Sequence, residues 1–145
     1  MAVVPEVKPA AATSLLEIRG LRTHFATDEG MVHAVDGVDL AISRGETVCV
    51  VGESGCGKTV TALSVLKLIA MPPGRIVGGQ ILWQGRDIVP LHADAMNRIR
   101  AKEIGIIFQE PMTSLNPVFT VGEQIAEVIR LHEGLNRRAA RRSMC

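Results

Sequence analysis

Two runs of partly alternating apolar and polar residues lie near the start of the chain. Leu15–Arg19 and Val32–Ile42 are rich in apolar and β-branched residues, a pattern typical of half-buried strands. Asp28-Glu29-Gly30 lies between them and is a turn signal. These residues predict two antiparallel strands of a small sheet.

A strand, a glycine-rich loop and a helix are predicted next. Thr47–Val51 is a continuous apolar run, which is typical of a strand buried on both faces. Over Gly57–Ala70 the apolar residues broadly follow helical spacing, and Pro72-Pro73-Gly74 ends that segment. We therefore expect a central parallel strand at Thr47–Val51, followed by the loop and a helix.

The remainder of the chain predicts further short strands and helices. The expected elements are a strand over Ile76–Gln84, a helix over Asp94–Lys102, a strand over Ile104–Phe108 and a helix over Val121–Glu133 that Gly134 ends. Four arginines within Arg137–Arg142 are interpreted as the solvated start of another helix. No internal repeat is visible in the sequence.

Length and charge limit the classes of protein to which the chain can belong. Its 145 residues make up at most one ordinary domain. Sixteen Lys and Arg against fifteen Asp and Glu give a net charge of +1, and only 3% of the residues are aromatic. Neither a non-specific polyanion binder nor a base-stacking single-strand binder fits this composition, so nucleic acid is not expected as a partner.

The beginning of the chain and the cysteines carry no targeting or metal-binding signal. Residues 1–14 have no basic segment ahead of an apolar core, so we interpret them as a flexible leader. Cys49, Cys56 and Cys145 are odd in number and widely spaced, which favours neither a disulfide framework nor a thiolate zinc site and indicates a reducing compartment. The longest apolar stretch, Val60–Met71, is shorter than the roughly 20 residues that cross a bilayer.

The residues between the predicted strand and helix match the pattern G-x-x-x-x-G-K-[ST]. Glycines let successive backbone N–H groups curl around an anion, and the helix N-terminus adds a positive potential. Lys58 would reach the β- and γ-phosphate oxygens, and the Thr59 hydroxyl would coordinate the Mg²⁺ that bridges them. The alternative is a flexible turn without a ligand. The residues expected to contact the nucleotide are Gly52, Glu53, Ser54, Gly55, Cys56, Gly57, Lys58, Thr59 and Val60.

With this loop placed, the chain resembles the N-terminal half of the ATP-binding subunits of ABC transporters, from about Leu15 to Arg142. Ile107–Pro117 resembles the Q-loop of the branch that imports dipeptides, oligopeptides and glutathione, and Val118–Glu127 is most similar to the glutathione and peptide importers. The resemblance implies an α/β fold, a phosphate-loop NTPase (RecA-like) core with an N-terminal antiparallel β subdomain. It also implies a subunit that binds ATP and Mg²⁺ and energises peptide or glutathione import.

The same resemblance assigns roles outside the glycine loop. Gln109 matches the Q-loop glutamine, which helps to hold Mg²⁺ and the γ-phosphate and forms the catalytic set together with Lys58. Phe25 matches an aromatic position that stacks on adenine, although a half-buried strand residue is an equal alternative. The residues expected to contact a transmembrane partner, unless they pack a local core, are Glu110, Leu115, Phe119 and Val121.

Partners and location follow from the resemblance as well. Transmembrane permease subunits are expected to bind through the Q-loop region, and a second ATP-binding subunit is expected to complete a homodimer or heterodimer. The subunit would then lie peripherally on the cytoplasmic face of the inner or plasma membrane. Other subunits select the solute in this family, so the resemblance ranks substrates only weakly.

Elements that the family carries after the Q-loop are missing from the sequence that follows Gln109. They are a Leu-Ser-Gly-Gly-Gln signature, an apolar strand ending in Asp-Glu, and a histidine in the switch context. Hydrolysis also needs a second acidic support for Mg²⁺ and a group that orients water, and neither has a convincing candidate. We therefore interpret residues 15–145 as a partial nucleotide-binding domain, truncated before its helical subdomain is complete, and expect weak nucleotide binding with little turnover.

Two other functions are also compatible with the sequence. One is a truncated, non-catalytic nucleotide-binding remnant without transport activity. The other is an unrelated phosphate-loop NTPase, such as a kinase or a GTPase, although the Asn-Lys-x-Asp element that a guanine reader usually needs does not appear.

Overall fold

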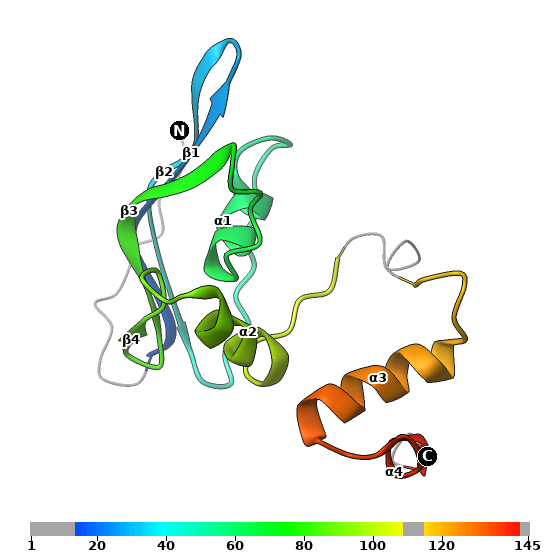
Figure 1. Ribbon diagram of the computed structural model, residues 1–145. Coiled ribbons are helices and arrows are strands. Elements are labelled where there is room, and N and C mark those ends of the chain that lie inside the picture. Colours follow the sequence, from blue (N-terminus) through cyan, green and yellow to red (C-terminus); the bar gives the residue numbers. More distant parts are fainter. Residues whose placement is uncertain (1–13, 109–114, 143–145) are drawn as a thin grey trace. The chain divides into compact units, whose positions relative to one another are not determined.

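The computed structural model describes residues 14–108 and 115–142 (Figure 1). The chain divides into two compact units, residues 1–96 and residues 97–145. In the described residues, the first unit holds a sheet and one helix and is called the sheet unit. The second contains two further helices and is called the helical unit. Helix α2 (Ala93–Lys102) runs across the division and confirms the helix predicted there.

The sheet has four strands in the order β2-β1-β3-β4. β1 (Ser14–Thr27) and β2 (Gly30–Ser43) form a long hairpin, and β3 (Gly74–Trp83) and the short β4 (Arg86–Asp87) complete the sheet. All of these pairings are antiparallel. The predicted hairpin is therefore confirmed, with longer strands than the sequence indicates, and so is the later strand that corresponds to β3.

The hairpin turn is fixed by local interactions. Thr27 Oγ1 donates a hydrogen bond to Gly30 O at 2.8 Å, and the same two residues are the last Cα partners of the ladder. Gly30 has a φ of 126°, a conformation that residues with a Cβ rarely adopt. The glycine of the predicted turn is thus required by the backbone.

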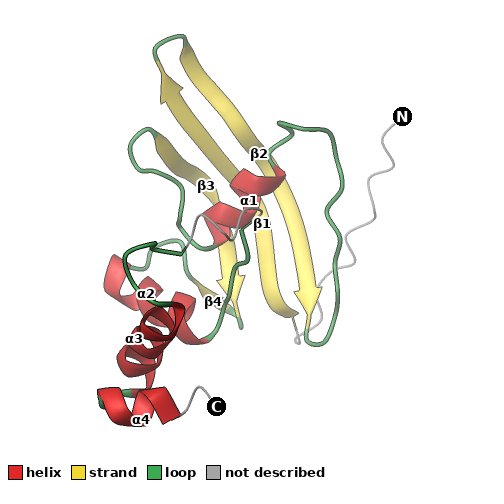
Figure 2. Cartoon of the chain, turned by 90° about the vertical axis from the view of Figure 1, so that its right-hand side faces the viewer, coloured by secondary structure: helices red, strands yellow, loops and turns green. Residues whose placement is uncertain are grey.

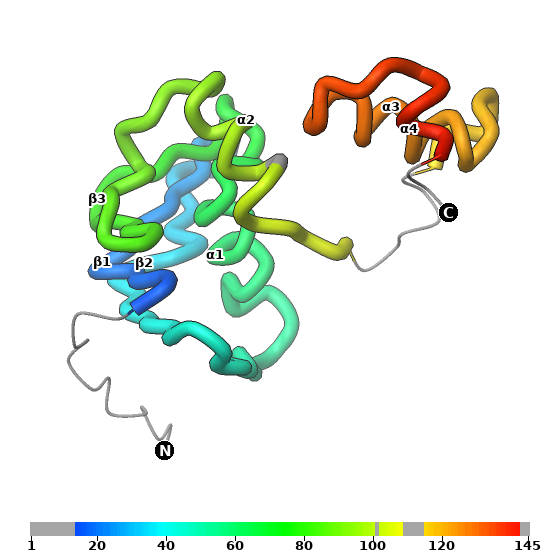
Figure 3. Tube along the Cα trace, turned by 90° about the horizontal axis from the view of Figure 1, so that it is seen from below, coloured from blue at the N-terminus to red at the C-terminus, as the bar shows by residue number. Residues whose placement is uncertain are grey.

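Helix α1 (Lys58–Val65) lies against one face of this sheet, as two views at right angles to Figure 1 show (Figures 2 and 3). Ile18 and Leu21 of β1 and Ile81 of β3 are at most 2% exposed. The other buried apolar side chains of the unit are Val35, Val65, Leu66, Ile69, Ile88 and Met96. Removal of this apolar surface from water is the main stabilising contribution to the sheet unit.

Helix α1 ends at Val65, which is earlier than the predicted end at Ala70. Lys67 adopts a left-handed φ of 51°, which a right-handed helix does not contain. Its ammonium group donates hydrogen bonds to Val89 O at 2.8 Å and to Leu91 O at 2.7 Å. Because these distant carbonyls hold Lys67 outside the helix, the apolar spacing that continues to Ala70 produces no further helical turn.

Two of the predicted strands are wrong. Thr47–Val51 and Ile104–Phe108 have no regular secondary structure, and Val51 and Ile107 are 89% and 93% exposed. A strand needs a neighbour that exchanges ladder hydrogen bonds with it. The ranges that the structure describes contain antiparallel strand pairs and no parallel one. The apolar composition of both runs suits a strand, but composition alone does not supply the partner.

Helix α3 (Val121–Glu133) confirms the predicted helix and its predicted end. At its N-terminus, Thr120 Oγ1 accepts a hydrogen bond from the Glu123 N–H at 3.3 Å. At its C-terminus, Gly134 adopts a left-handed φ of 68° and its N–H bonds to Arg130 O. Among residues 14–108 and 115–142, no helix combines the length and the apolar character needed to span a bilayer.

Helix α4 (Arg137–Arg142) packs on α3 and shows that the arginine run is helical, as expected. Ala126 of α3 and Ala140 of α4 are 4% and 0% exposed. Small side chains are therefore buried in these two helices, and the longer ones extend from them.

Candidate phosphate-binding site

The glycine-rich loop lies between β2 and α1, and α1 begins inside the motif at Lys58. Gly55 and Gly57 have φ values of 83° and 88°, which glycine adopts without strain. Gly57 is the N-cap of α1 and offers no side chain to the N–H groups of the first turn. Residues 52–56 are exposed. An approaching anion would therefore reach the open N-terminus of a helix, in agreement with the predicted helix start.

Lys58 is held by the main chain of the loop. Its ammonium group donates hydrogen bonds to Gly52 O and Glu53 O, each at 2.7 Å. The same nitrogen lies 3.5 Å from Cys56 Sγ, and the Cys56 N–H bonds to Glu53 O at 3.4 Å. The cation of the motif is thus fixed beside the backbone that would surround a phosphate.

Gly57 also makes a close approach to β2. A Cβ added to Gly57 would lie 2.3 Å from Ala34 O and 3.6 Å from Val35 Cγ2. An added Cβ at Gly52 would instead meet a side-chain atom, Cys56 Sγ, at 2.7 Å. Gly57 is therefore required for its positive φ and again for its contact with the backbone of β2, which no change of rotamer can relieve.

The first turn of α1 fits a phosphate group. The leading N–H groups of a helix have no intrahelical partner, and the helix dipole favours negative charge at this end. Thr59 is exposed in this turn and Val60 is partly buried. In the described part of the chain, no cluster of three or more His, Cys, Asp or Glu could hold a metal ion. A cation here would rest on phosphate oxygens together with the Thr59 hydroxyl.

Phe25 lies on β1, with Val32 of β2 and Gly74 of β3 as its Cα partners. Its ring packs over Gly74, because a Cβ added there would lie 2.8 Å from Phe25 Cε1. The residue is half-buried. Phe25 is therefore a half-buried strand residue, as the alternative interpretation expects, and part of its surface stays accessible. Its stacking on adenine stays a prediction.

A buried polar pair joins β1 to α1, and sequence reasoning did not identify it. Thr23 Oγ1 and Ser64 Oγ lie 2.9 Å apart, and both residues are 0% exposed. Ser64 Oγ also donates a hydrogen bond to Val60 O at 2.7 Å. Single hydroxyl residues within apolar elements carry no sequence signal that could have revealed this pair.

The residues predicted to act around the Q-loop are only partly described. Gln109 and Glu110 lie outside the described residues. Leu115, Phe119 and Val121 are 43%, 57% and 52% exposed. This exposure argues against a local core and is what a contact surface requires.

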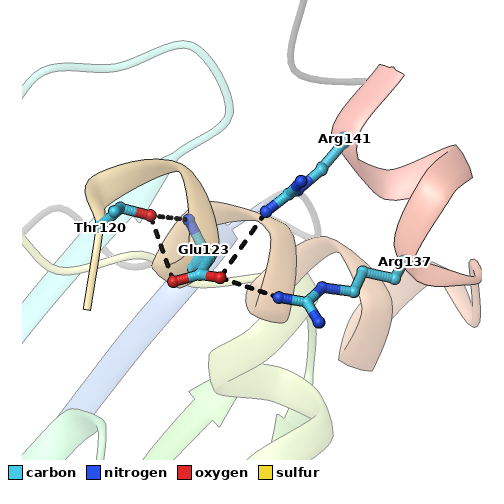
Figure 4. Close-up of polar contacts among 4 residues, drawn as sticks. All are labelled: Thr120, Glu123, Arg137 and Arg141. Atoms are coloured by element: carbon cyan, nitrogen blue, oxygen red, sulfur yellow. Dashed lines mark hydrogen bonds and ion pairs between the residues drawn. The ribbon is translucent and has the colours of Figure 1, made fainter.

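Glu123 links α3 to α4 (Figure 4). Its Oε1 lies 2.8 Å from Arg137 Nη2 and 3.6 Å from Arg141 Nη2, and its Oε2 accepts a hydrogen bond from Thr120 Oγ1 at 3.3 Å. Two of the four arginines that were expected only to be solvated are thus paired, although both stay more than half exposed. The sequence from Thr120 to Glu123 has the T-x-x-E spacing of a capping box, a signal that could have placed Glu123 at this helix start.

Known proteins resemble this chain in sequence. Residues 35–144 match the protein family described as ABC transporter. The chain is 50% identical over 130 residues to the oligopeptide transport ATP-binding protein OppD of Bacillus subtilis, with 90% of this chain and 36% of that protein covered. It is 46% identical over 132 residues to OppD of Salmonella typhimurium, with 91% and 39% covered. The chain thus spans 36% and 39% of the length of these two curated relatives.

Solved structures share the fold. A bacterial ABC transporter cassette in a dimeric structure has a TM-score of 0.73 and 22% identity, with 88% of this chain and 53% of that chain covered. An ATP-binding cassette in a post-hydrolysis state bound to ADP and Pi has a TM-score of 0.74 at the same identity and coverage. This likeness confirms the expected α/β phosphate-loop fold with its N-terminal antiparallel β subdomain, although the described residues form none of the parallel strand pairs of its core.

Proposed function

The chain belongs to the ABC transporter family, and from this premise we propose that it is the ATP-binding part of a subunit that energises peptide import. The relatives at 50% and 46% identity are oligopeptide transport ATP-binding proteins. Family membership removes the unrelated kinase or GTPase from consideration. Glutathione stays the alternative solute. The observation that carries the proposal is the loop geometry, in which Gly57 opens the helix N-terminus and Lys58 lies beside it.

Lys58 and the main chain of the loop would bind the nucleotide phosphates. The Lys58 ammonium already faces the loop backbone through its bonds to Gly52 O and Glu53 O. A phosphate oxygen carries more negative charge than a carbonyl and makes a stronger charge-assisted bond. We therefore expect Lys58 to exchange these carbonyls for the β- and γ-phosphate oxygens when ATP binds.

Thr59 and Gln109 are the proposed metal ligands of the site. Thr59 is exposed in the first turn of α1, next to the N–H groups that would hold the phosphates. Gln109 is proposed from the resemblance of its segment to a Q-loop. Mg²⁺, when bound, supplies positive charge that neutralises the β- and γ-phosphate oxygens.

Phe25 is the proposed adenine contact. Its half-buried ring on β1 leaves part of the side chain accessible. Stacking between a base and an aromatic side chain contributes roughly 1–3 kcal/mol. We therefore expect most of the affinity to come from the phosphates and a smaller, base-dependent part from Phe25.

A transmembrane permease and a second ATP-binding subunit are the proposed partners. Leu115, Phe119 and Val121 are exposed around the start of α3 and are proposed, together with Glu110, as the permease contact. A second subunit is proposed because a structural neighbour is described as dimeric. Such a complex would place the chain peripherally on the cytoplasmic face of the membrane.

Hydrolysis by these residues alone is not part of the proposal. The chain spans 36% and 39% of the two curated relatives, and the signature motif, the Asp-Glu strand and the switch histidine do not occur in its sequence. We propose that residues 15–145 form a partial nucleotide-binding domain. A non-catalytic remnant is the competing function, and ATPase activity above that of a Lys58→Ala variant would count against it.

Calorimetric titration with ATP and MgCl₂ tests the proposed function. Lys58→Ala removes the ammonium, so we expect ATP affinity to fall about tenfold or more, as the loss of a charge-assisted hydrogen bond of about 1.5–3 kcal/mol implies. Lys102→Ala is the matched control, because Lys102 is an exposed lysine at the end of α2. Equal ATP affinity of the wild-type chain and Lys58→Ala would refute the phosphate-binding role of the loop.

A further inference from the structure

We infer that Thr23 and Ser64 are positioning residues that hold the strand carrying Phe25 at a fixed distance from the phosphate-binding end of α1. The inference rests on the proposed function, in which Phe25 stacks on adenine and α1 binds the phosphates. It adds two residues that touch neither end of the nucleotide but set the separation between the groups that do.

The hydrogen bonds of the pair have a defined direction. Ser64 Oγ donates its single proton to Val60 O at 2.7 Å. In the 2.9 Å contact with Thr23 Oγ1, Ser64 Oγ must therefore accept, and Thr23 is the donor. The result is a relay from the Thr23 hydroxyl through the Ser64 hydroxyl to the Val60 carbonyl.

The relay connects the two parts of the proposed nucleotide site. Its first member, Thr23, precedes Phe25 by two residues on β1. Its last member, Val60, follows Lys58 by two residues in the first turn of α1. Because Thr23 and Ser64 are both 0% exposed, water cannot replace a lost partner, and the buried hydroxyls stay bonded to each other.

The Thr23–Ser64 bond holds α1 near its C-terminal end, and a second contact holds its N-terminal end. Gly57, the N-cap, approaches Ala34 of β2 so closely that an added Cβ would lie 2.3 Å from the Ala34 carbonyl oxygen. Ala34 follows Val32 by two residues, and Val32 is the Cα partner of Phe25. Both anchors of the helix therefore lie two residues from the Phe25–Val32 pair. Together they determine where α1 lies relative to the aromatic ring.

A positioning role and a purely structural role have different effects on the affinities for two ligands, ATP and inorganic tripolyphosphate. ATP uses both the ring and the loop, whereas inorganic tripolyphosphate uses the loop only. Base stacking of roughly 1–3 kcal/mol corresponds to an ATP preference of about 5-fold to 150-fold over tripolyphosphate. A shift of β1 against α1 lowers this preference and leaves tripolyphosphate affinity unchanged, whereas partial unfolding lowers both affinities in proportion.

Titrating the full chain with ATP and with sodium tripolyphosphate, each with MgCl₂, tests the inference. Thr23→Val keeps the shape and removes the donor, so we expect the ATP preference to fall at least about 5-fold. Thr23→Ser restores the hydroxyl and should keep the preference. Ile81→Val, a substitution at another fully buried position of the sheet, is the control for lost stability and should leave the ratio unchanged.

The outcomes separate this inference from the proposed function. An unchanged ATP preference in Thr23→Val overturns the positioning role alone. A wild-type chain that binds ATP no more tightly than tripolyphosphate overturns the Phe25 assignment and the positioning role together. If Thr23→Val does not fold, Ser64→Ala interrupts the same relay from the side of α1, and alanine favours the helical conformation. An unchanged preference for ATP over tripolyphosphate in Ser64→Ala would then overturn the inference.

Discussion

The sheet unit and helices α3 and α4 differ in the size of the side chains that they bury. In the sheet unit, Ile18, Leu21 and Ile81 are at most 2% exposed. In α3 and α4 the buried side chains are those of alanines, whereas Leu131 is 73% exposed. At roughly 25 cal/mol per Å² of apolar surface, burial stabilises the sheet unit far more than it stabilises these two helices.

This difference matches two kinds of task. A ligand loop needs a support that does not shift. The loop of residues 52–59 leads into α1, whose N-cap Gly57 contacts the backbone of β2 and whose Ser64 and Val65 are buried. Exposed apolar side chains on α3, such as Ile125 and Val128, are typical of a surface that is covered by a partner. The proposed nucleotide site therefore lies on the unit that buries the larger apolar side chains.

The largest expected effect comes from the core of the sheet unit. Ile81→Ala should lower the free energy of unfolding by about 2–5 kcal/mol, because it leaves a cavity in a fully buried position. Leu131→Ala on α3 should change it by less than about 0.5 kcal/mol. Urea denaturation followed by circular dichroism measures both effects, and the fluorescence of Trp83, the single tryptophan, reports separately on β3. Equal effects of the two substitutions would remove the contrast between the regions.

A smaller effect is expected from the contact between the loop and β2. Gly57→Ala combines a positive φ of 88° with a Cβ 2.3 Å from a backbone oxygen. Gly45→Ala is the matched control, because Gly45 has a similar φ of 74° and open space around the added Cβ. We expect Gly45→Ala to cost about 1–2 kcal/mol from backbone strain alone.

Gly57→Ala should cost more than its control and should also weaken ATP binding, because the first turn of α1 must move away from Ala34. Thermal unfolding and ATP titration of both variants measure the two effects. If Gly57→Ala bound ATP as tightly as Gly45→Ala does, the loop would not depend on its support by β2.

The smallest expected effect comes from the charges between α3 and α4. Glu123→Gln weakens the contacts to Arg137 and Arg141, whose side chains are 66% and 56% exposed. Exposed ion pairs contribute about 0–1 kcal/mol and are screened by salt. We expect a small loss of helix content in circular dichroism at low salt that disappears in about 1 M NaCl.

Glu127→Gln on the same helix is the control for Glu123→Gln. The described residues show no ion pair of Glu127, so its substitution should have less effect at low salt. A loss of equal size in both variants would mean that helix charge alone, and not the link to α4, accounts for the change.

Local signals in the sequence predicted much of the fold. The hairpin follows from alternating residues around Asp28-Glu29-Gly30, and the start of α1 follows from the glycine motif. Helix α3 follows from its apolar spacing and from Gly134. In each case the residues that decide the structure are close together in the chain, so the pattern is visible without the fold.

Features that depend on distant residues were not predictable in this way. The early end of α1 depends on carbonyls at Val89 and Leu91. The strand expected at Thr47–Val51 lacks a pairing neighbour within the described ranges. In the candidate site, the motif predicted the loop, but the Thr23–Ser64 bond joins residues 41 apart that have no distinctive pattern. Residue type indicates which local structures a segment can adopt, and contacts with distant residues determine which of them it adopts.

The two hydrogen bonds from Lys58 to backbone carbonyls influence which anions the loop is expected to bind. If Lys58 binds phosphate as proposed, the ligand must replace Gly52 O and Glu53 O as acceptors of the ammonium protons. Binding is then an exchange of partners, and its net enthalpy is smaller than the new contacts alone would give. Chloride offers one diffuse charge and gains little from that exchange. A polyphosphate offers several charged oxygens at once. Selectivity among anions is therefore expected to depend on the two carbonyl hydrogen bonds that Lys58 loses as much as on the bonds that it forms with the anion.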